Sequence, residues 1–396
     1  MAYLVLFDKN FIPLGSPSEG EISTVHVCKS WSLKRKSFEF DEFKAVCKGY
    51  KDSQNAVYAG LFENDGQLIY MCLSGIPTTK DDLTTVNGID VRQVFNQEIP
   101  VDYSQAFGRD GKTSALDIYK VLLGDSMVNI ASGVSYSGVP YSYDLNNVSG
   151  ERISQYSSDS SELISPTKKI RNIWEQIQAC NANFSCVLVA EWKNDRKTNF
   201  YSLTFKVKPV LNVYTIRLKD FNVNRTLNQN VVNHVRVWDS ALTWVIAEFF
   251  LLKQPMVEAK QAGGYTSYKF TYITRYFSEK CCYPIRSQAF AAEASDSSES
   301  ADESTAKENE QEACEEAVQT LIESVSKDRV TIDLNSKYGK MLDGIDLSDM
   351  GLLVGYYSAD GEDSEDKYLP VSAIETDSSG TKKAEFGRLS EYWFME

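Results

Sequence analysis

Two histidines, His26 and His234, are the only imidazole groups in this chain of 396 residues, and they limit the chemistry that it could perform. Each lies in an alternating run typical of a strand, TVHVCKSW and VVNHVRVW. A histidine in such a run is usually a packed or surface strand residue rather than a general base. A Ser-His-Asp triad would need one of them, and no GxSxG turn is present to hold its serine. The sequence therefore predicts no catalytic residue.

Metal and cofactor sites also lack a supporting pattern. The chain has no HExxH motif and no Cys/His quartet, and no two of its eight cysteines have CxxC spacing. Acidic side chains cluster in DGIDLSD (343–349) and DGEDSED (360–366), but neither run has the sixth-position glycine or the closing glutamate of an EF-hand. We interpret both as solvated turns. Gly-rich phosphate-binding loops are missing as well, so we expect no cofactor, no bound metal, and cysteines that are buried free thiols.

A glycosidase is the enzyme class that is hardest to exclude. The chain has 55 acidic side chains, and the separation of a catalytic carboxylate pair is invisible in a sequence. Tyrosine and tryptophan could form a sugar-binding platform, but aromatic residues on strands are mostly core residues. We expect a protein without enzymatic activity.

Charge and hydropathy exclude two further classes. The net charge is −14 and the isoelectric point about 4.8, which argues against a protein that grips nucleic acid. The densest basic run is Lys34-Arg35-Lys36, and we interpret it as a solvated strand end or loop. The N-terminus lacks the basic region of a signal peptide, and the apolar stretch at 241–252 is too short to span a bilayer. We expect a soluble protein that is made in the cytoplasm and does not insert into membranes.

The first hundred residues read as short strands separated by turns. Turn chemistry recurs at Asn64-Asp65-Gly66, Gly75-Ile76-Pro77 and Asn87-Gly88. Apolar residues alternate between these turns, so one face of each strand is apolar. Strands of five or six residues punctuated in this way are typical of a small barrel.

Helical spacing appears after residue 111. The run TSALDIYKVLLG predicts a helix that Thr113 or Ser114 would cap, with Gly124 at its end. A second helix is expected from 165–167, with an apolar stripe of Ile170, Ile173, Trp174 and Ile177. The strands SCVLVAEW and NFYSLTFKV then predict a hairpin.

The C-terminal half returns to strands. Residues 291–316 are rich in serine, alanine and acidic residues, which predicts a mobile loop or linker that leads into a helix. Alternation at Val330, Ile332 and Leu334 and the strands GLLVGYYS and KYLPVSAI follow.

The predicted fold class is α+β and mostly β. It has two barrel-like β domains, an inserted α+β domain, and a helix before the last strands. The expected boundaries are a first barrel (1–105 with 208–238), an inserted domain (106–207), a second β domain (239–290 with 327–396) and an acidic loop with its helix (291–326).

Several stretches, taken in order, resemble the baseplate hub or tail-associated proteins of siphophages, which are similar to the myophage baseplate hub. The stretches that carry the resemblance are SWSLKRKSFEF, AVYAGLF with LIYMCLSGI, TVNGIDVRQVF, IPVDYS, NRTLNQNVVNHVRVW and EEAVQTLIESVSKDRVTIDL. The chain departs from the family at 347–351, where the family has Leu-Gly-Asp, and in its acidic insertion at 291–316.

The resemblance implies a homotrimer at the virion tail tip, or baseplate. Each subunit would supply two barrel-like units, so three subunits would match a hexameric distal tail protein. Such a hub closes the tail tube and opens for DNA ejection, and genomic DNA passes through its lumen without specific binding. Other baseplate proteins, including a separate receptor-binding protein, would be further partners.

Two other functions remain open. An adhesin-like tail protein could bind host glycans through a Tyr-rich segment at 134–143, and a cell-wall hydrolase could use a pair of carboxylates.

Overall fold

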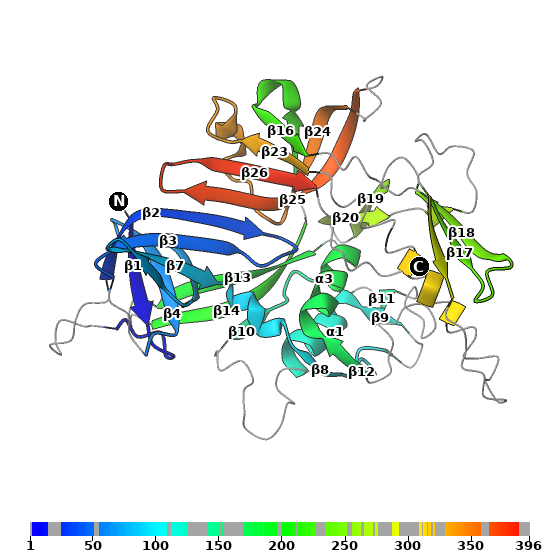
Figure 1. Ribbon diagram of the computed structural model, residues 1–396, viewed down its shortest axis with the longest axis horizontal. Coiled ribbons are helices and arrows are strands. Elements are labelled where there is room, and N and C mark those ends of the chain that lie inside the picture. Colours follow the sequence, from blue (N-terminus) through cyan, green and yellow to red (C-terminus); the bar gives the residue numbers. More distant parts are fainter. Residues whose placement is uncertain are drawn as a thin grey trace.

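The computed structural model is dominated by β-structure, with few and short helices (Figure 1). The residues that the structure describes are 2–14, 25–50, 55–108, 112–125, 141–150, 152–153, 169–184, 186–195, 200–210, 212–226, 234–251, 256–262, 265–271, 274–275, 287–292, 309–310, 312–314, 316–317, 320, 329–357 and 364–387. Half of the strands in the described part of the chain belong to one continuous sheet of thirteen strands that folds into two lobes. The predicted α+β, mostly β, fold class is confirmed.

The first lobe is a closed barrel. Its six strands are β1 (Ala2–Phe7), β2 (Val25–Lys36), β3 (Glu42–Lys48), β4 (Tyr58–Glu63), β5 (Leu68–Leu73) and β7 (Leu83–Ile89), with the short β6 (Thr78–Lys80) beside β7. The hydrogen-bonded order is β1-β4-β5-β7-β3-β2, and β2 pairs again with β1. Closure leaves these six strands without a free edge between them.

Alternation along the strands decides which side chains fill the barrel. On β1, Leu4 and Leu6 belong to the barrel's own core, whereas Val5 and Phe7 belong to a second cluster outside it. The period of two residues therefore lets one strand bury both of its faces. The predicted alternation of the N-terminal region is confirmed, and on β1 the alternate side chains enter two different cores.

Gly88 on β7 shows how tightly the barrel is packed. A Cβ atom there would lie 2.2 Å from Cys72 Sγ and 2.7 Å from Phe43 Cδ1. We expect Gly88→Ala to lower the free energy of unfolding by about 1–3 kcal/mol, because this core has no space for the methyl group. Adding Cys72→Ala should restore part of the loss, since it removes the nearest atom.

Urea unfolding of the single and double variants measures this effect. Gly150→Ala is the matched control, because its Cβ would only reach ordinary contact with Leu116 at 3.7 Å. Equal stability of the Gly88 and Gly150 variants would contradict the packing argument.

The second lobe is a six-stranded sheet assembled from two distant parts of the chain. Its strands are β15 (Asn212–Arg217), β16 (Val223–Thr226), β23 (Arg329–Asp333), β24 (Asp349–Tyr357), β25 (Ser364–Asp377) and β26 (Lys382–Gly387). The order is β15-β24-β25-β26-β23-β16, with a 3-10 turn (Leu218–Asp220) between the two outer strands. Val330, Ile332 and Leu334 are buried in the core of this lobe, as their alternation predicts.

This arrangement corrects two expected boundaries. Residues 212–226 were assigned to the first barrel, but β15 pairs with β24 and β16 with β23, so both strands belong to the second lobe. The strands β17 (His234–Trp238) and β18 (Val245–Leu251) belong to neither lobe. They form a separate small sheet with β21 (Thr274–Arg275) and β22 (Ser287–Ala291).

The small sheet lies at the far end of the molecule from the N-terminus (Figure 1). Residues described within 309–320 are helical, and Ala313 and Ala317 pack in one apolar cluster with Val235 and Val237 of β17. The helix expected after the acidic run therefore packs against this small sheet. A hairpin of β19 (Met256–Ala262) and β20 (Tyr265–Thr271) makes another two-stranded sheet. The acidic run at 293–308 lies outside the described residues.

Between the lobes and the helices lies a long hairpin of β13 (Cys186–Asp195) and β14 (Phe200–Pro209). Val187 and Val189 of β13 pack in the core of the second lobe, whereas Leu188 packs with the helices. The hairpin thus contributes to two cores at once, and the inserted region packs as an integral layer of the molecule.

The two helices predicted for the inserted region are present, and the second begins later than expected. α1 (Ala115–Lys120) is capped by Ser114, which accepts a hydrogen bond from the amide of Asp117, and a π-helical turn (Val121–Asp125) continues it. α3 (Ile173–Asn183) begins after Asn172, whose side chain caps it. Ile170 therefore lies on a strand with its side chain 72% exposed, while the other three residues of the predicted stripe are buried.

Short strand pairs complete this region. They are β8 (Glu98–Val101) with β12 (Lys169–Asn172), β9 (Thr113–Ser114) with β11 (Arg152–Ile153), and β10 (Ser142–Asp144) beside β14. Within the described residues no helix has the length and apolar character needed to cross a bilayer.

Candidate functional site: the junction of the two β lobes

One strand joins the lobes. The first half of β2 pairs with β1, and its second half, Ser32–Lys36, pairs antiparallel with Asp377–Ala373 of β25 (Figure 1). The barrel and the second lobe therefore share one hydrogen-bonded sheet. Because the register of this pairing fixes which residues oppose each other, it also fixes how the lobes lie relative to one another.

The basic run Lys34-Arg35-Lys36 lies on this joining half of β2. Lys34 Nζ is 3.0 Å from Glu385 of β26, and Arg35 Nη2 is 2.9 Å from Asp346 in the loop before β24. Lys36 pairs with Glu39 within the first lobe. Interpreting the run as a solvated strand end or loop was therefore wrong, since two of its three cations bind carboxylates of the other lobe.

The acidic run 343–349 supplies the other side of these contacts. Asp346 also lies 3.5 Å from Lys208, and the side chain of Asp349 accepts hydrogen bonds from the Asp346 amide and from Asn212. Burial opposes the ionisation of Asp346, but Arg35, the Leu347 amide and Lys208 outweigh it and lower the pKa of this carboxyl. The run is thus part of the junction rather than a free turn, and residues 360–363 of the second acidic run lie outside the described residues.

Ser37 fixes the end of the joining strand. Its side chain is fully buried, and its hydroxyl donates to the carbonyl oxygens of Val371 (2.6 Å) and Leu347 (3.3 Å). Its amide donates to the carbonyl of Ser372 at 3.0 Å. A single residue of the first lobe thus satisfies three backbone acceptors of the second.

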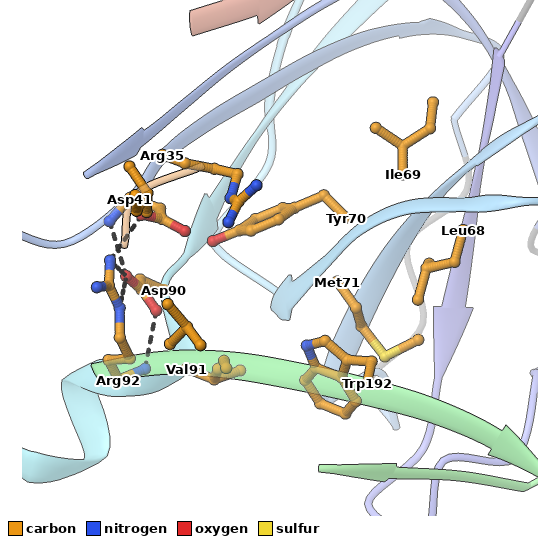
Figure 2. Close-up of a pocket in the computed structure, with 13 residues that line it drawn as sticks. Arg35, Asp41, Leu68, Ile69, Tyr70, Met71, Asp90, Val91, Arg92 and Trp192 are labelled. Atoms are coloured by element: carbon orange, nitrogen blue, oxygen red, sulfur yellow. Dashed lines mark hydrogen bonds and ion pairs between the residues drawn. The ribbon is translucent and has the colours of Figure 1, made fainter. Parts of the chain in front are cut away.

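A buried ion network of Asp41, Asp90 and Arg92 lies beside the end of β2 (Figure 2). Arg92 Nε donates to Asp90 Oδ2 at 2.8 Å, and Arg92 Nη2 lies 2.6 Å from Asp41 Oδ1. The side chains of Arg92 and Asp90 are 2% and 1% exposed, so both charged groups are shielded from solvent. Asp90 Oδ1 also caps the 3-10 turn Val91–Phe95 that follows β7, and Oδ2 accepts a further hydrogen bond from the Asp41 amide.

Arg92 connects three parts of the chain through its remaining N–H groups. These donate to the carbonyl oxygens of Lys36, Glu39 and Leu188. The ring of Trp174 on α3 lies 5.6 Å from the guanidinium carbon, which adds a cation–π contact. The end of β2, the hairpin strand β13 and the helix are therefore held by one side chain with five N–H donors.

The environment shifts the protonation of the network. Burial raises the pKa of Asp41 to about 6. The negative charge of Asp90 raises this pKa further, and the positive charge of Arg92 offsets only part of the rise. Burial opposes the charge of Arg92 as well, but Asp41 and Asp90 outweigh it and raise the pKa of the guanidinium. Tyr70, beside the network, has a pKa well above its ordinary value because it is buried near both carboxylates.

A cavity of about 260 Å³ lies next to the network (Figure 2). Its walls come from β5, β13 and the loop at Leu347, so it lies where the barrel, the hairpin and the second lobe meet. Arg35 and Tyr70 extend into this region from one side and Trp192 from the other. The charged atoms are engaged with each other, and the arrangement forms a structural joint between the lobes.

Similarity to known proteins is found in the structure and not in the sequence. No family model matches the sequence, and no curated protein matches it. A chain in the structure of the phage P2 baseplate in its activated conformation with Ca has a TM-score of 0.50 and 7% identity over 98% of this chain and 99% of that chain. A topological model of the p2 virion baseplate in activated conformation gives the same values. This chain has a phage baseplate fold. A 43 kDa tail protein of prophage MuSo2 from Shewanella oneidensis is also similar in structure, with a TM-score of 0.46 and 9% identity over 100% of this chain and 99% of that chain.

The residues that make the joint of this baseplate fold were not identified from the sequence as a site. Asp90 and Arg92 lie in TVNGIDVRQVF, a stretch that carried the resemblance without an assigned role. The available signal was two opposite charges flanking Val91 directly after a strand, in an otherwise apolar run. His26 and His234 are buried on β2 and β17, as expected for packed strand residues. The six cysteines in the described part of the chain are free thiols, five of them buried.

Part of the Tyr-rich segment can be placed in the baseplate fold. Residues 134–140 lie outside the described residues, whereas Tyr141 packs against Phe205 and Phe95 and donates a hydrogen bond to the Leu123 carbonyl. Tyr141 is therefore partly buried against the core. Within the described residues no group of three or more His, Cys, Asp or Glu side chains is arranged to hold a metal ion.

The raised pKa of Asp41 predicts a pH dependence. The folded protein holds this proton more tightly than the unfolded chain, so the associated stability is present at low pH and is lost as the pH rises from about 4 through 6. Asp41→Asn cannot ionise and escapes this loss. Between pH 4.5 and 7.5, wild type should lose about 1–3 kcal/mol of unfolding free energy relative to the variant.

Urea unfolding of both proteins at several pH values tests this expectation. Glu98→Gln, a change at an exposed strand residue, controls for the general effect of removing a negative charge. A difference between wild type and Asp41→Asn that stays constant with pH, or grows in favour of wild type as the pH rises, would show that folding does not raise the pKa of Asp41.

Proposed function

We propose that this protein is a structural component of a phage tail, a trimeric baseplate hub at the tail tip. The observation that carries the proposal is the presence of two six-stranded β lobes in one chain, joined through β2 and β25. Three copies around a threefold axis would present six such lobes. A ring of six similar units can then bind a hexameric tube protein although only three chains form it.

The joint described above supports this role mechanically. Six lobes form an even ring only if the two lobes within each chain keep a fixed relative orientation. The strand pairing, the ion pairs of Lys34 and Arg35, and the buried Arg92 network all oppose rotation of one lobe against the other. A flexible linker between the lobes would lack this property.

The charge of the chain fits passage of DNA through the ring. A net charge of −14 gives a surface that repels phosphate groups rather than retaining them. We propose that the trimer closes the tail tube and opens for DNA ejection, that a hexameric distal tail protein is its neighbour, and that a separate protein binds the receptor. A structural role without enzymatic activity follows from the same proposal.

The oligomeric state tests the proposal. Light scattering of the purified full chain, alone and with a hexameric distal tail protein, should give a mass of three chains and a complex of three chains with one hexamer. Asp65→Asn, a change at the exposed β4–β5 turn, serves as a control for effects of purification and storage on the measured mass. A chain that stays monomeric at all concentrations and does not bind the hexamer would refute the trimeric hub.

A further inference from the structure

Cys28 and Cys47 lie directly opposite each other on neighbouring strands of the first barrel. The antiparallel register of β2 and β3 pairs the two residues, and their sulfur atoms are 3.6 Å apart. Cys28 is 7% exposed and Cys47 is fully buried. The proposed function makes no use of either thiol.

We propose that Cys28 and Cys47 form a cross-strand disulfide when the protein meets an oxidant. Opposed residues of an antiparallel pair have Cα atoms about 4.5–5.5 Å apart. This spacing falls within the range of about 4.4–6.8 Å that disulfides bridge. The sulfur atoms need to approach by about 1.5 Å to reach a bond length of about 2.05 Å, a movement that side-chain rotation supplies without displacing the strands.

The position of the pair gives the bond a structural consequence. Cys28 is the residue at which β2 changes partners, since it opposes Ala2 of β1 on one side and Cys47 of β3 on the other. The register of β2 against β3 shifts between Cys28 and Ser30. A covalent bond here would clamp the barrel at the place where its first strand closes onto its second.

The thiols are arranged for a two-step oxidation by a small peroxide. A hydrogen bond between the two side chains lowers the pKa of Cys47 and raises that of Cys28, so Cys47 supplies the thiolate. Its sulfur attacks one oxygen of hydrogen peroxide, which gives a sulfenic acid and, with one proton, the first water. The Cys28 sulfur then attacks the sulfenic sulfur, the S–S bond forms and a second water leaves. Two thiols lose two electrons and two protons, and the peroxide is reduced to two waters.

Cys72 provides a contrast within the same barrel. It is fully buried, and its thiol donates to the Ala59 carbonyl at 3.4 Å rather than to another sulfur. Burial raises its pKa, so it stays a protonated thiol. Oxidation should therefore select the pair and spare Cys72.

The timing of the bond rests on the proposed function. A virion protein is made in a reducing cytoplasm and acts outside the cell, where disulfides persist. The link would therefore form after assembly and strengthen the barrel in the released particle.

Peptide mapping of the full chain tests the proposal. Reduced protein is treated with hydrogen peroxide, alkylated and digested without reductant, and the peptides are identified by mass spectrometry. We expect a Cys28–Cys47 cross-linked peptide, an alkylated Cys72, and a melting temperature about 3–6 °C higher that reverts on adding reductant. Cys28→Ser and Cys47→Ser should abolish the shift, whereas Cys72→Ala should keep it.

Three outcomes would overturn the proposal. They are alkylation of both Cys28 and Cys47 after peroxide treatment, oxidation of Cys47 to the sulfinic acid beside an alkylated Cys28, and a cross-link from either residue to another cysteine. Mapping needs no assembled trimer, so its result is independent of the oligomeric state on which the proposed function depends.

Discussion

Replacing Arg92 by methionine should destabilise the protein by about 3–5 kcal/mol at pH 7.5, the expected cost of removing one partner from a buried ion network. The variant leaves the carboxylates of Asp41 and Asp90 close together without a cation. Three buried carbonyl oxygens also lose their donors. Urea unfolding followed by tryptophan fluorescence measures the loss, and Trp174 over the guanidinium reports directly on the site.

Two further variants separate the network from a general charge effect. Lys120→Met removes a cation that pairs with Asp117 at 3.4 Å on an exposed helix face, and it should cost less than about 1 kcal/mol. The double variant Asp90→Asn/Arg92→Met should be less unstable than the sum of its single changes, because it removes a charge together with its partner. If Arg92→Met is as mild as Lys120→Met, the joint does not depend on this network.

Replacing Phe386 by alanine should destabilise the second lobe by about 3–5 kcal/mol, because the ring is fully buried in that lobe's core. The ring packs over Gly351 of β24, where an added Cβ would lie 2.7 Å from it, so β24 has no side chain at this position with which to fill the cavity. Hydrogen exchange should rise in residues 329–387 more than in residues 25–89.

Leu61→Ala is the matched variant for the first lobe. Leu61 is also fully buried, in the barrel's own core. Its loss should raise exchange in residues 25–89 more than in residues 329–387. Equal increases in both regions for both variants would show that the two lobes share a single core, in conflict with the separate clusters found here.

The sequence predicted the parts of the fold that depend on neighbouring residues. Alternation of apolar residues and the turn chemistry at Asn64-Asp65-Gly66 and Gly75-Ile76-Pro77 are local signals, and they predicted strands and turns of the barrel correctly. The turn expected at Asn87-Gly88 is wrong, because both residues lie within β7 and pair with β3. The hairpin of β13 and β14 was predicted for the same reason. Its strands pair with each other, so both halves of the pattern lie side by side in the chain.

Long-range pairing could not be predicted in this way. β15 and β24 are partners although Asn212 and Asp349, which oppose each other, are more than a hundred residues apart. Alternation shows that such a strand buries one face, but it carries no information on which strand lies beside it. This is why residues 212–226 were assigned to the wrong lobe.

The joint was missed for a related reason. In sequence, Asp41, Asp90 and Arg92 are ordinary charged residues, and a charged residue is exposed in most proteins. They become a buried network only because two strands and the turn after β7 bring them together. Lys34-Arg35-Lys36 was misjudged likewise, since its partners Asp346 and Glu385 lie more than three hundred residues away.

We propose that two rigidly joined lobes in one chain allow three chains to form a ring of six units. Cryo-electron microscopy of the assembled protein viewed along its axis tests it most directly. We predict end-on averages with six similar lobes in threefold repetition, the two lobes of each chain adjacent and joined at β2 and β25. A ring with another number of lobes, or particles in which the two lobes of one chain take variable orientations, would contradict the account.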